Sequence, residues 1–286
     1  MSDPSPFGAP VFALRSGGAM PGIGFGTWRI GESPGEAERE NAALRRALDR
    51  GFTHFDTAEM YGEGGSEEIL GTAIAGVPRE RLFLTSKFYP HHARADQMVA
   101  ACDRSLRRLG VEWLDLYLLH WPGGTPFEET LEGARRLREA GKIRAFGVSN
   151  FDADGMAHLF AAGLGEAIEV NQILHNPSRR GVEFDLLPLL AAHGVACMAY
   201  TPIEPHRLSR SAAFRALAEA EGLSPAQLAL AWHMTRGSTC PIPKSATPEH
   251  VDALADAAAM RLRAATMGAI DAAFPAPTRA EPLEIL

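Results

Sequence analysis

Short apolar runs and longer amphipathic stretches alternate along this chain. The stretch 36–50 has the helical period, because Ala43, Leu44 and Ala47 recur on one face. Gly51 follows this stretch and is typical of a residue that ends a helix. The alternation predicts strands that begin at residues 22, 54, 82, 114, 144, 168, 195 and 239. Helices are predicted over 36–50, 94–109, 127–140, 183–193, 212–221 and 225–235, and further helices begin at 66, 153 and 248.

Each of the eight predicted strands is followed by at least one helix, at intervals too short for a domain break. This pattern predicts a single α/β domain over residues 1–286, folded as a (β/α)8 TIM barrel. The alternative is an open doubly wound sheet. It is less favoured because the glycines at 22, 24 and 26 lack the spacing and the immediate helix of a dinucleotide-binding turn.

The two ends of the chain fall outside the repeating units. Residues 11–20 contain two short runs around a Ser-Gly-Gly turn, which predicts a β-hairpin that plugs one end of the barrel. Residues 1–10 contain prolines and serines, and we expect them to be disordered. They show neither the basic start nor the apolar run of a signal peptide or membrane anchor. A short tail follows Phe274 at the other end.

Composition narrows the class of partner. The 286 residues carry a formal net charge of -7, which argues against nucleic acid or an anionic membrane as the main partner. Cys102, Cys197 and Cys240 are odd in number and far apart, as in a reduced cytoplasmic protein without structural disulfides. We therefore expect a cytoplasmic monomer that acts on small molecules.

Polar side chains stand where successive predicted strands end. Asp56 closes the run that begins at residue 54, and Tyr61 lies on the loop beyond it. Lys87 and His120 close two later runs in the same way. Parallel barrels build their active sites from such positions. An ammonium beside a phenol favours the phenolate and lowers the phenol's pKa, while a carboxylate holds the ammonium in place. The set can therefore donate a proton to a carbonyl without a metal.

The remaining strand ends favour a cofactor site. Ser149, Asn150 and Gln172 suit a carboxamide, and Tyr200 offers a ring for stacking. Lys244, with the adjacent Ser245 and the helix that begins at Pro248, is a candidate phosphate site.

A metal site finds little support in the sequence, whereas a substrate pocket stays a candidate. His91 and His92 lack a third ligand at a convincing spacing, so we expect no metal site. Aromatic residues usually belong to the core. At strand ends, however, Trp28, Tyr89 and Trp121 are candidates for the wall of a substrate pocket.

These residues belong to motifs that resemble the aldo-keto reductase superfamily over nearly the whole chain, and most closely its bacterial methylglyoxal and small-aldehyde reductases. The motifs are Gly26-Thr27-Trp28, Asp56-Thr57-Ala58-Glu59-Met60-Tyr61-Gly62, Leu118-Leu119-His120-Trp121, Gly147-Val148-Ser149-Asn150-Phe151, Asn171-Gln172 and Ile242-Pro243-Lys244-Ser245. The resemblance implies NADPH-dependent reduction of small aldehydes or ketones, with NADH as a possible second cofactor.

The resemblance also implies roles for single residues. The catalytic residues would be Asp56, Tyr61, Lys87 and His120, with Tyr61 as the general acid. The substrate would meet Trp28, Tyr89, His120 and Trp121. The cofactor would be bound by Thr27, Trp28, Asp56, Ser149, Asn150, Gln172, Tyr200, Thr201, Pro202, Ile242, Lys244, Ser245 and His250.

Some positions depart from the family pattern. His250 replaces a frequent arginine, and Ala253 and Leu254 replace residues that often bind adenine, so the preference for NADPH is less secure than the hydride chemistry. The short tail implies a more open, less selective site. Two alternatives stay open: a cofactor-binding redox sensor or scaffold with little turnover, and a metal-dependent hydrolase on the same fold.

Overall fold

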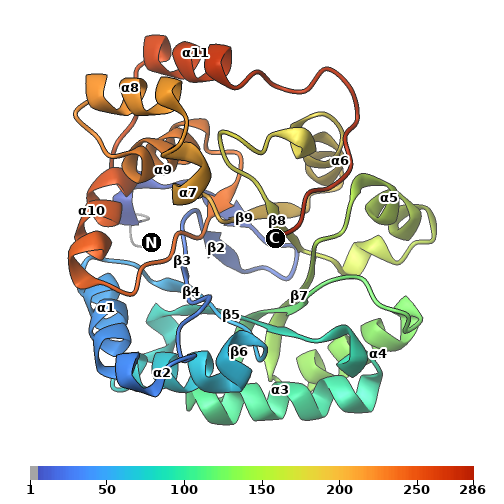
Figure 1. Cartoon of the computed structure of the whole chain (residues 1–286). Helices are drawn as coiled ribbons and strands as arrows, with labels where there is room; N and C mark the ends of the chain where they lie inside the picture. Colours follow the sequence, from blue (N-terminus) through green and yellow to red (C-terminus); the bar gives the residue numbers. More distant parts are fainter. Residues whose placement is uncertain (1–5) are drawn as a thin grey trace.

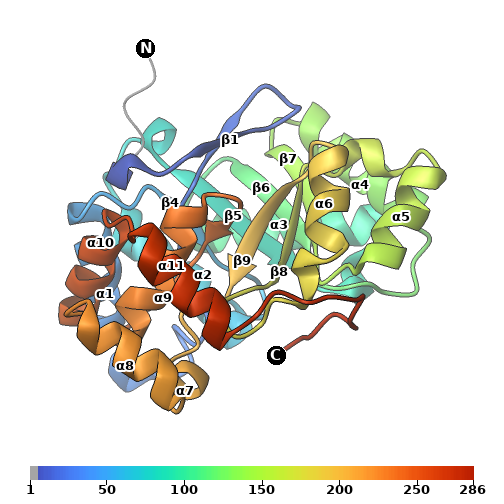
Figure 2. The same cartoon turned by 90° about the horizontal axis from the view of Figure 1, so that it is seen from above.

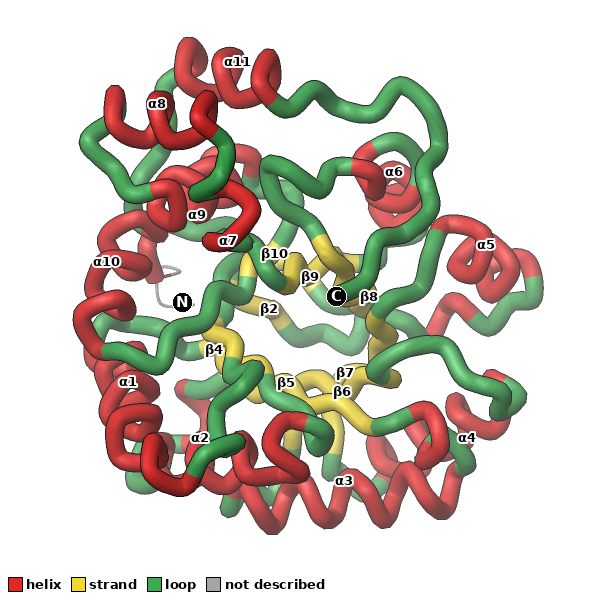
Figure 3. The backbone as a smooth tube through the Cα atoms, in the orientation of Figure 1, coloured by secondary structure: helices red, strands yellow, loops and turns green. Residues whose placement is uncertain are grey.

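The computed structural model describes residues 6–286 and shows eight parallel strands surrounded by helices (Figures 1 and 3). Neighbours in the sheet are also neighbours in sequence, from β3 through to β10. The strands are β3 (Phe25–Gly26), β4 (His54–Asp56), β5 (Phe83–Phe88), β6 (Leu114–Leu119), β7 (Ile143–Ser149), β8 (Val170–Leu174), β9 (Ala196–Tyr200) and β10 (Cys240–Pro241).

The sheet closes between its first and last strands. The amide of Gly24 donates to the carbonyl of Pro241 at 3.0 Å, and that of Gly26 donates to Pro243 at 2.8 Å. The predicted TIM barrel is thereby confirmed, and the open doubly wound sheet is wrong.

Helices form the outer layer at nearly every predicted position. They are α1 (Ala37–Asp49), α2 (Gly65–Ile74), α3 (Ala95–Leu109), α4 (Phe127–Glu139), α5 (Ala153–Ala161), α6 (Leu186–Ala192), α7 (Pro205–Leu208), α8 (Ala212–Ala220), α9 (Pro225–Arg236), α10 (Pro248–Ala258) and α11 (Ala264–Ala273). The sequence did not predict α7 or α11. None of the helices within residues 6–286 has both the length and the apolar character needed to cross a bilayer.

Two apolar layers hold the barrel together. One lies between the strands and the helices, and the other fills the barrel interior with side chains such as Leu116, Val170 and Met198. The hairpin of β1 (Val11–Ala13) and β2 (Ala19–Pro21) contributes the buried Met20 to the interior layer. It lies at the end of the barrel opposite the chain's C-terminus (Figure 2), as predicted for a plug.

The expectation that residues 1–10 are disordered is wrong for their second half. A short 3-10 helix covers Pro6–Gly8, and Ala9 is buried. The ring of Phe7 packs against that of Phe52 with centroids 4.9 Å apart, so apolar burial orders this segment. Residues 1–5 lie outside the described part of the chain.

Candidate active site

A cavity of about 550 Å³ opens at the C-terminal ends of the barrel strands. Most of the side chains predicted for catalysis and cofactor binding line it. Its wall consists of Gly26, Trp28, Arg29, Asp56, Met60, Tyr61, His120, Ser149, Asn150, Gln172, Tyr200, Thr201, Pro202, Ile203, Glu204, Pro205, His206, Ile242, Lys244 and Leu286. This is the end at which parallel barrels carry their active sites.

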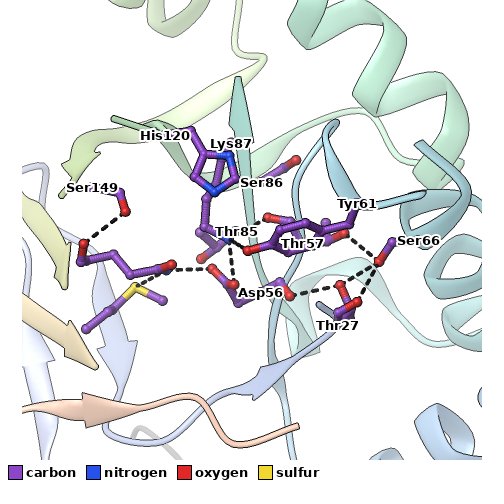
Figure 4. Close-up of polar contacts among 12 residues, drawn as sticks. Thr27, Asp56, Thr57, Tyr61, Ser66, Thr85, Ser86, Lys87, His120 and Ser149 are labelled. Carbon is purple, nitrogen blue, oxygen red and sulfur yellow. Dashed lines mark hydrogen bonds and ion pairs between the residues drawn. The ribbon is translucent and has the colours of Figure 1, made fainter. Parts of the chain in front are cut away.

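Lys87 lies at the centre of the polar residues at the base of this cavity (Figure 4). Its Nζ donates to Asp56 Oδ2 at 2.6 Å and to Tyr61 Oη at 3.1 Å. A third bond runs to the carbonyl oxygen of Thr57 at 2.9 Å. The side chains of Lys87 and Asp56 are 0% and 2% exposed. The ammonium is therefore fully bonded within the protein and has one carboxylate and one phenol as partners.

The turn after β4 brings Tyr61 back over Lys87. Gly62 has φ 57°, a left-handed backbone conformation that residues other than glycine rarely adopt. A Cβ added to Gly62 would lie 2.6 Å from the carbonyl oxygen of Gly31. The motif around Tyr61 therefore needs glycine at position 62, because both the conformation and the close approach exclude a side chain.

Burial governs the protonation of the groups in this site. It raises the pKa of Tyr61 above its ordinary value, and Lys87 offsets only part of this rise. The expectation of a lowered tyrosine pKa is therefore wrong, because the phenol loses more solvation than one ammonium restores. Burial, with Lys87 nearby, holds the pKa of His120 well below its ordinary value. Both side chains are neutral near pH 7.

Amide and hydroxyl groups also line the cavity. Gln172 Nε2 donates to Asp56 Oδ1 at 2.7 Å, and Asn150 Nδ2 donates to the carbonyl of His120 at 3.1 Å. The Tyr200 hydroxyl donates to Asn150 Oδ1 at 2.9 Å, which fixes its ring at the cavity wall. These bonds connect the ends of β4, β6, β7, β8 and β9.

Two cationic side chains, Arg29 and Lys244, also line the cavity. Lys244 is partly buried, and burial lowers its pKa. The nearby carboxylates of Glu40 and Glu32 raise this pKa, whereas the positive charge of Arg29 lowers it further. Arg29 has a left-handed φ of 65°, and its guanidinium carbon lies 5.1 Å from the centre of the Trp28 ring. Within residues 6–286 no carboxylate pairs with Arg29. The part of the cavity wall that these two cations form therefore favours an anion.

A sequence profile of the aldo/keto reductase family matches residues 22–274. The chain belongs to the aldo/keto reductase family. It is therefore an oxidoreductase.

Named relatives of this reductase resemble it over most of their length. Methylglyoxal reductase YeaE of Escherichia coli (strain K12) is 40% identical over 264 residues, which cover 91% of this chain and 93% of that protein. An aldo-keto reductase of Mycolicibacterium smegmatis is 36% identical, with coverages of 85% and 86%. The crystal structure of an aldo/keto reductase from Klebsiella pneumoniae, in complex with NADP and acetate, is 40% identical with a TM-score of 0.91 and coverages of 97% and 100%.

Several residues predicted for the site of the reductase lie outside the cavity wall. Thr27 is buried behind Asp56, and the Ser245 hydroxyl is bonded to the backbone of Thr247. His250 is exposed in the first turn of α10. Tyr89 and Trp121 are also absent from the wall, although the Trp121 ring centroid is 5.0 Å from that of His120, which does line it.

The structure also adds wall residues that the sequence did not reveal. Arg29 directly follows a motif at a strand end, which was the available signal. Leu286 reaches the cavity because the tail returns across the barrel mouth (Figure 1), where Arg179 Nη1 holds Glu284 at 2.6 Å. The short tail therefore covers part of the mouth, and a more open, less selective site than in relatives with longer tails stays a prediction. Within residues 6–286 no cluster of His, Cys, Asp or Glu side chains could hold a metal ion.

Proposed function

We propose that this reductase converts small aldehydes or ketones, such as methylglyoxal, to alcohols, with NADPH as the hydride donor. The bonded set of Asp56, Lys87 and Tyr61 at the base of the cavity is the observation that carries the proposal. The 40% identity to a methylglyoxal reductase supports the size class of the substrate.

The cavity suits an extended nicotinamide dinucleotide. Ser149, Asn150 and Gln172 offer donors and acceptors for a carboxamide at one end, beside the Tyr200 ring. Arg29 and Lys244 provide positive charge for phosphates at the other end. Two crystal structures of aldo-keto reductase from Klebsiella pneumoniae contain NADP and NADPH, respectively. The cofactor, when bound, supplies the hydride.

Tyr61 acts as the proton donor in this proposal. Because burial keeps its pKa high, the phenol is fully protonated and can donate Oη–H to the carbonyl oxygen of the substrate. Lys87 Nζ lies 3.1 Å from Tyr61 Oη and stabilises the phenolate as it forms. Asp56 holds Lys87 in place and balances its charge. Burial keeps His120 neutral, so it can orient the carbonyl oxygen through one N–H.

The proposal is tested by following NADPH absorbance with methylglyoxal, with and without a chelator. We expect turnover that the chelator does not change. Cofactor binding without turnover of any aldehyde would instead favour the redox sensor or scaffold. Hydrolytic activity that the chelator abolishes would favour the metal-dependent hydrolase.

A further inference from the structure

Glu59 is a buried residue next to the proposed catalytic residues, but its carboxylate bonds to none of their side chains. Its side chain is 6% exposed and lies in the turn between β4 and Tyr61. Glu59 Oε1 accepts from the backbone amide of Tyr89 at 2.8 Å and lies 2.8 Å from His92 Nδ1. Glu59 Oε2 lies 3.4 Å from Arg104 Nη2. Because a carboxylate is costly to bury, Glu59 depends on these bonds to the loop after β5 to offset the loss of its solvation.

These bonds join the turn that carries Tyr61 to the loop that carries Tyr89. The backbone amide of Glu59 also donates to the carbonyl of Lys87 at 3.1 Å. Glu59 therefore contacts the chain on both sides of Phe88, at the point where β5 ends. The loop beyond this point, residues 89–92, has no other acidic side chain bonded to its backbone among residues 6–286.

A continuous series of ring contacts leads from this loop to the cavity. Tyr89 meets the Trp121 ring edge-on, with centroids 5.7 Å apart. Trp121 packs on His120 at 5.0 Å, and His120 meets Tyr61 at 5.7 Å. Tyr89 thus packs against Trp121, and Trp121 packs against His120, which lines the cavity.

We propose that Glu59 and His92 form a clasp that positions Tyr89 and Trp121 and so determines which carbonyl substrates this reductase accepts. The inference rests on the proposed function. Glu59 is a positioning residue, because it acts through Tyr89 and does not itself contact the cavity. With the clasp intact, the aromatic pair is held against His120 and favours small aldehydes. With the clasp broken, His120 in the cavity wall loses the support of Trp121, so small substrates are held less firmly and bulkier ones meet less resistance.

Matched variants separate the clasp from general stability. Glu59→Gln keeps an oxygen for the Tyr89 amide but removes the charge that holds His92 and Arg104. His92→Ala removes the ring donor, whereas His92→Asn retains an N–H near the position of Nδ1. The control is Glu129→Gln, which breaks the exposed ion pair, 3.3 Å long, between Glu129 on α4 and Arg94, the residue that precedes α3.

The measurements are kcat and KM for methylglyoxal and for benzaldehyde, the dissociation constant for NADPH, and the thermal midpoint. We expect Glu59→Gln and His92→Ala to raise KM for methylglyoxal about tenfold relative to benzaldehyde, the scale of one charge-assisted bond. The affinity for NADPH and the Glu129→Gln control should match wild type, and His92→Asn should restore most of the KM ratio. A lower thermal midpoint with an unchanged KM ratio would show a structural role only and overturn the clasp.

Amide hydrogen exchange at Tyr89 gives a readout that does not depend on turnover. Because the neutral amide oxygen of glutamine accepts a weaker hydrogen bond than the carboxylate, we expect exchange at this amide to accelerate in Glu59→Gln and not in Glu129→Gln. Unchanged exchange in Glu59→Gln would overturn the clasp even if the enzyme is active. A wild-type protein that turns over neither aldehyde would instead overturn the proposed function.

Discussion

Tyr61 is the residue on which the proposed proton transfer depends. Tyr61→Phe removes one hydroxyl and leaves the ring between Lys87 and His120. Because general acid catalysis contributes typically ~10²–10⁴-fold, we expect kcat to fall by about this factor while NADPH still binds. Steady-state kinetics and fluorescence titration measure the two effects.

Tyr117 provides a matched control for this substitution. It is fully buried, and its hydroxyl has no hydrogen-bond partner within the described residues. Tyr117→Phe should therefore leave kcat near the wild-type value. Equal activity of Tyr61→Phe and Tyr117→Phe would contradict the assignment of Tyr61 as the acid.

Lys244 determines the proposed preference between the two cofactors. NADPH differs from NADH by the 2′-phosphate alone, and a charge-assisted contact to it is worth roughly 1.5–3 kcal/mol. We expect Lys244→Ala to weaken NADPH about ten- to a hundredfold and NADH much less. Titration of both cofactors by quenching of tryptophan fluorescence measures the difference. Equal losses would mean that Lys244 contacts a phosphate that the two cofactors share.

The sequence was informative about those residues whose role follows from strand position. Asp56, Lys87 and His120 each close an apolar run, and a parallel barrel brings such ends together. Arg29 and Glu59 escaped prediction for a physical reason. The position of Arg29 depends on its left-handed backbone, and that of Glu59 depends on contacts between loops about thirty residues apart in the sequence.

At the scale of elements, the long apolar and amphipathic stretches predicted the barrel, and the short elements were missed. The α7 helix (Pro205–Leu208) is only 4 residues long, which leaves no helical period to detect. It begins at a strained turn, where Glu204 has φ 22° and Thr201 has φ 50°. Arg179 Nη2 lies 2.8 Å from the Glu204 carboxylate. An ion pair with a residue far away in the sequence therefore maintains a backbone conformation that the local residues disfavour.

The return of the tail was missed for a related reason. Arg179, which holds Glu204, also pairs with Glu284, and so connects the loop after β8, the strained turn and the tail. No local pattern in residues 275–286 indicates that pairing, because it depends on where the barrel places Arg179. The position of the tail over the barrel mouth could therefore not be predicted from its length.

At the scale of the whole molecule, buried histidines make stability depend on pH. Burial lowers the pKa of His54 to about 3, and it also lowers the pKa values of His175 and His233. The unfolded chain binds protons on these groups near pH 6.5, whereas folded His54 does so only near pH 3. The unfolded state therefore binds more protons within this window, and stability falls as pH decreases through it.

For His54 alone, the loss between pH 7 and pH 5 is about 2 kcal/mol. We expect the free energy of urea unfolding of His54→Gln to fall by about 2 kcal/mol less than that of wild type between pH 7 and pH 5. His54→Asn serves as a second variant. The same fall in stability for wild type and both variants would show that His54 takes up its proton without unfolding.

The closure between β3 and β10 has a consequence for how the molecule opens. Pro241 and Pro243 have no N–H to donate, so the carbonyls of this segment accept from Gly24 and Gly26 without return bonds. The join also connects the two sequence extremes of the barrel, which costs the most loop entropy to form. We therefore expect it to be the first part of the sheet to separate when the protein unfolds.

Trp28 and Arg29 extend from one side of this join, and Lys244 extends from the other. A dinucleotide that contacts both sides would act as a clamp across the weakest part of the barrel, and its binding energy would add directly to the resistance against opening. Saturating NADPH should then slow amide exchange at Gly24 and Gly26 more than at β5 and β6. Slower exchange everywhere except at these two glycines would rule out the clamp. The ligand that the enzyme needs for chemistry would thus also keep its barrel closed.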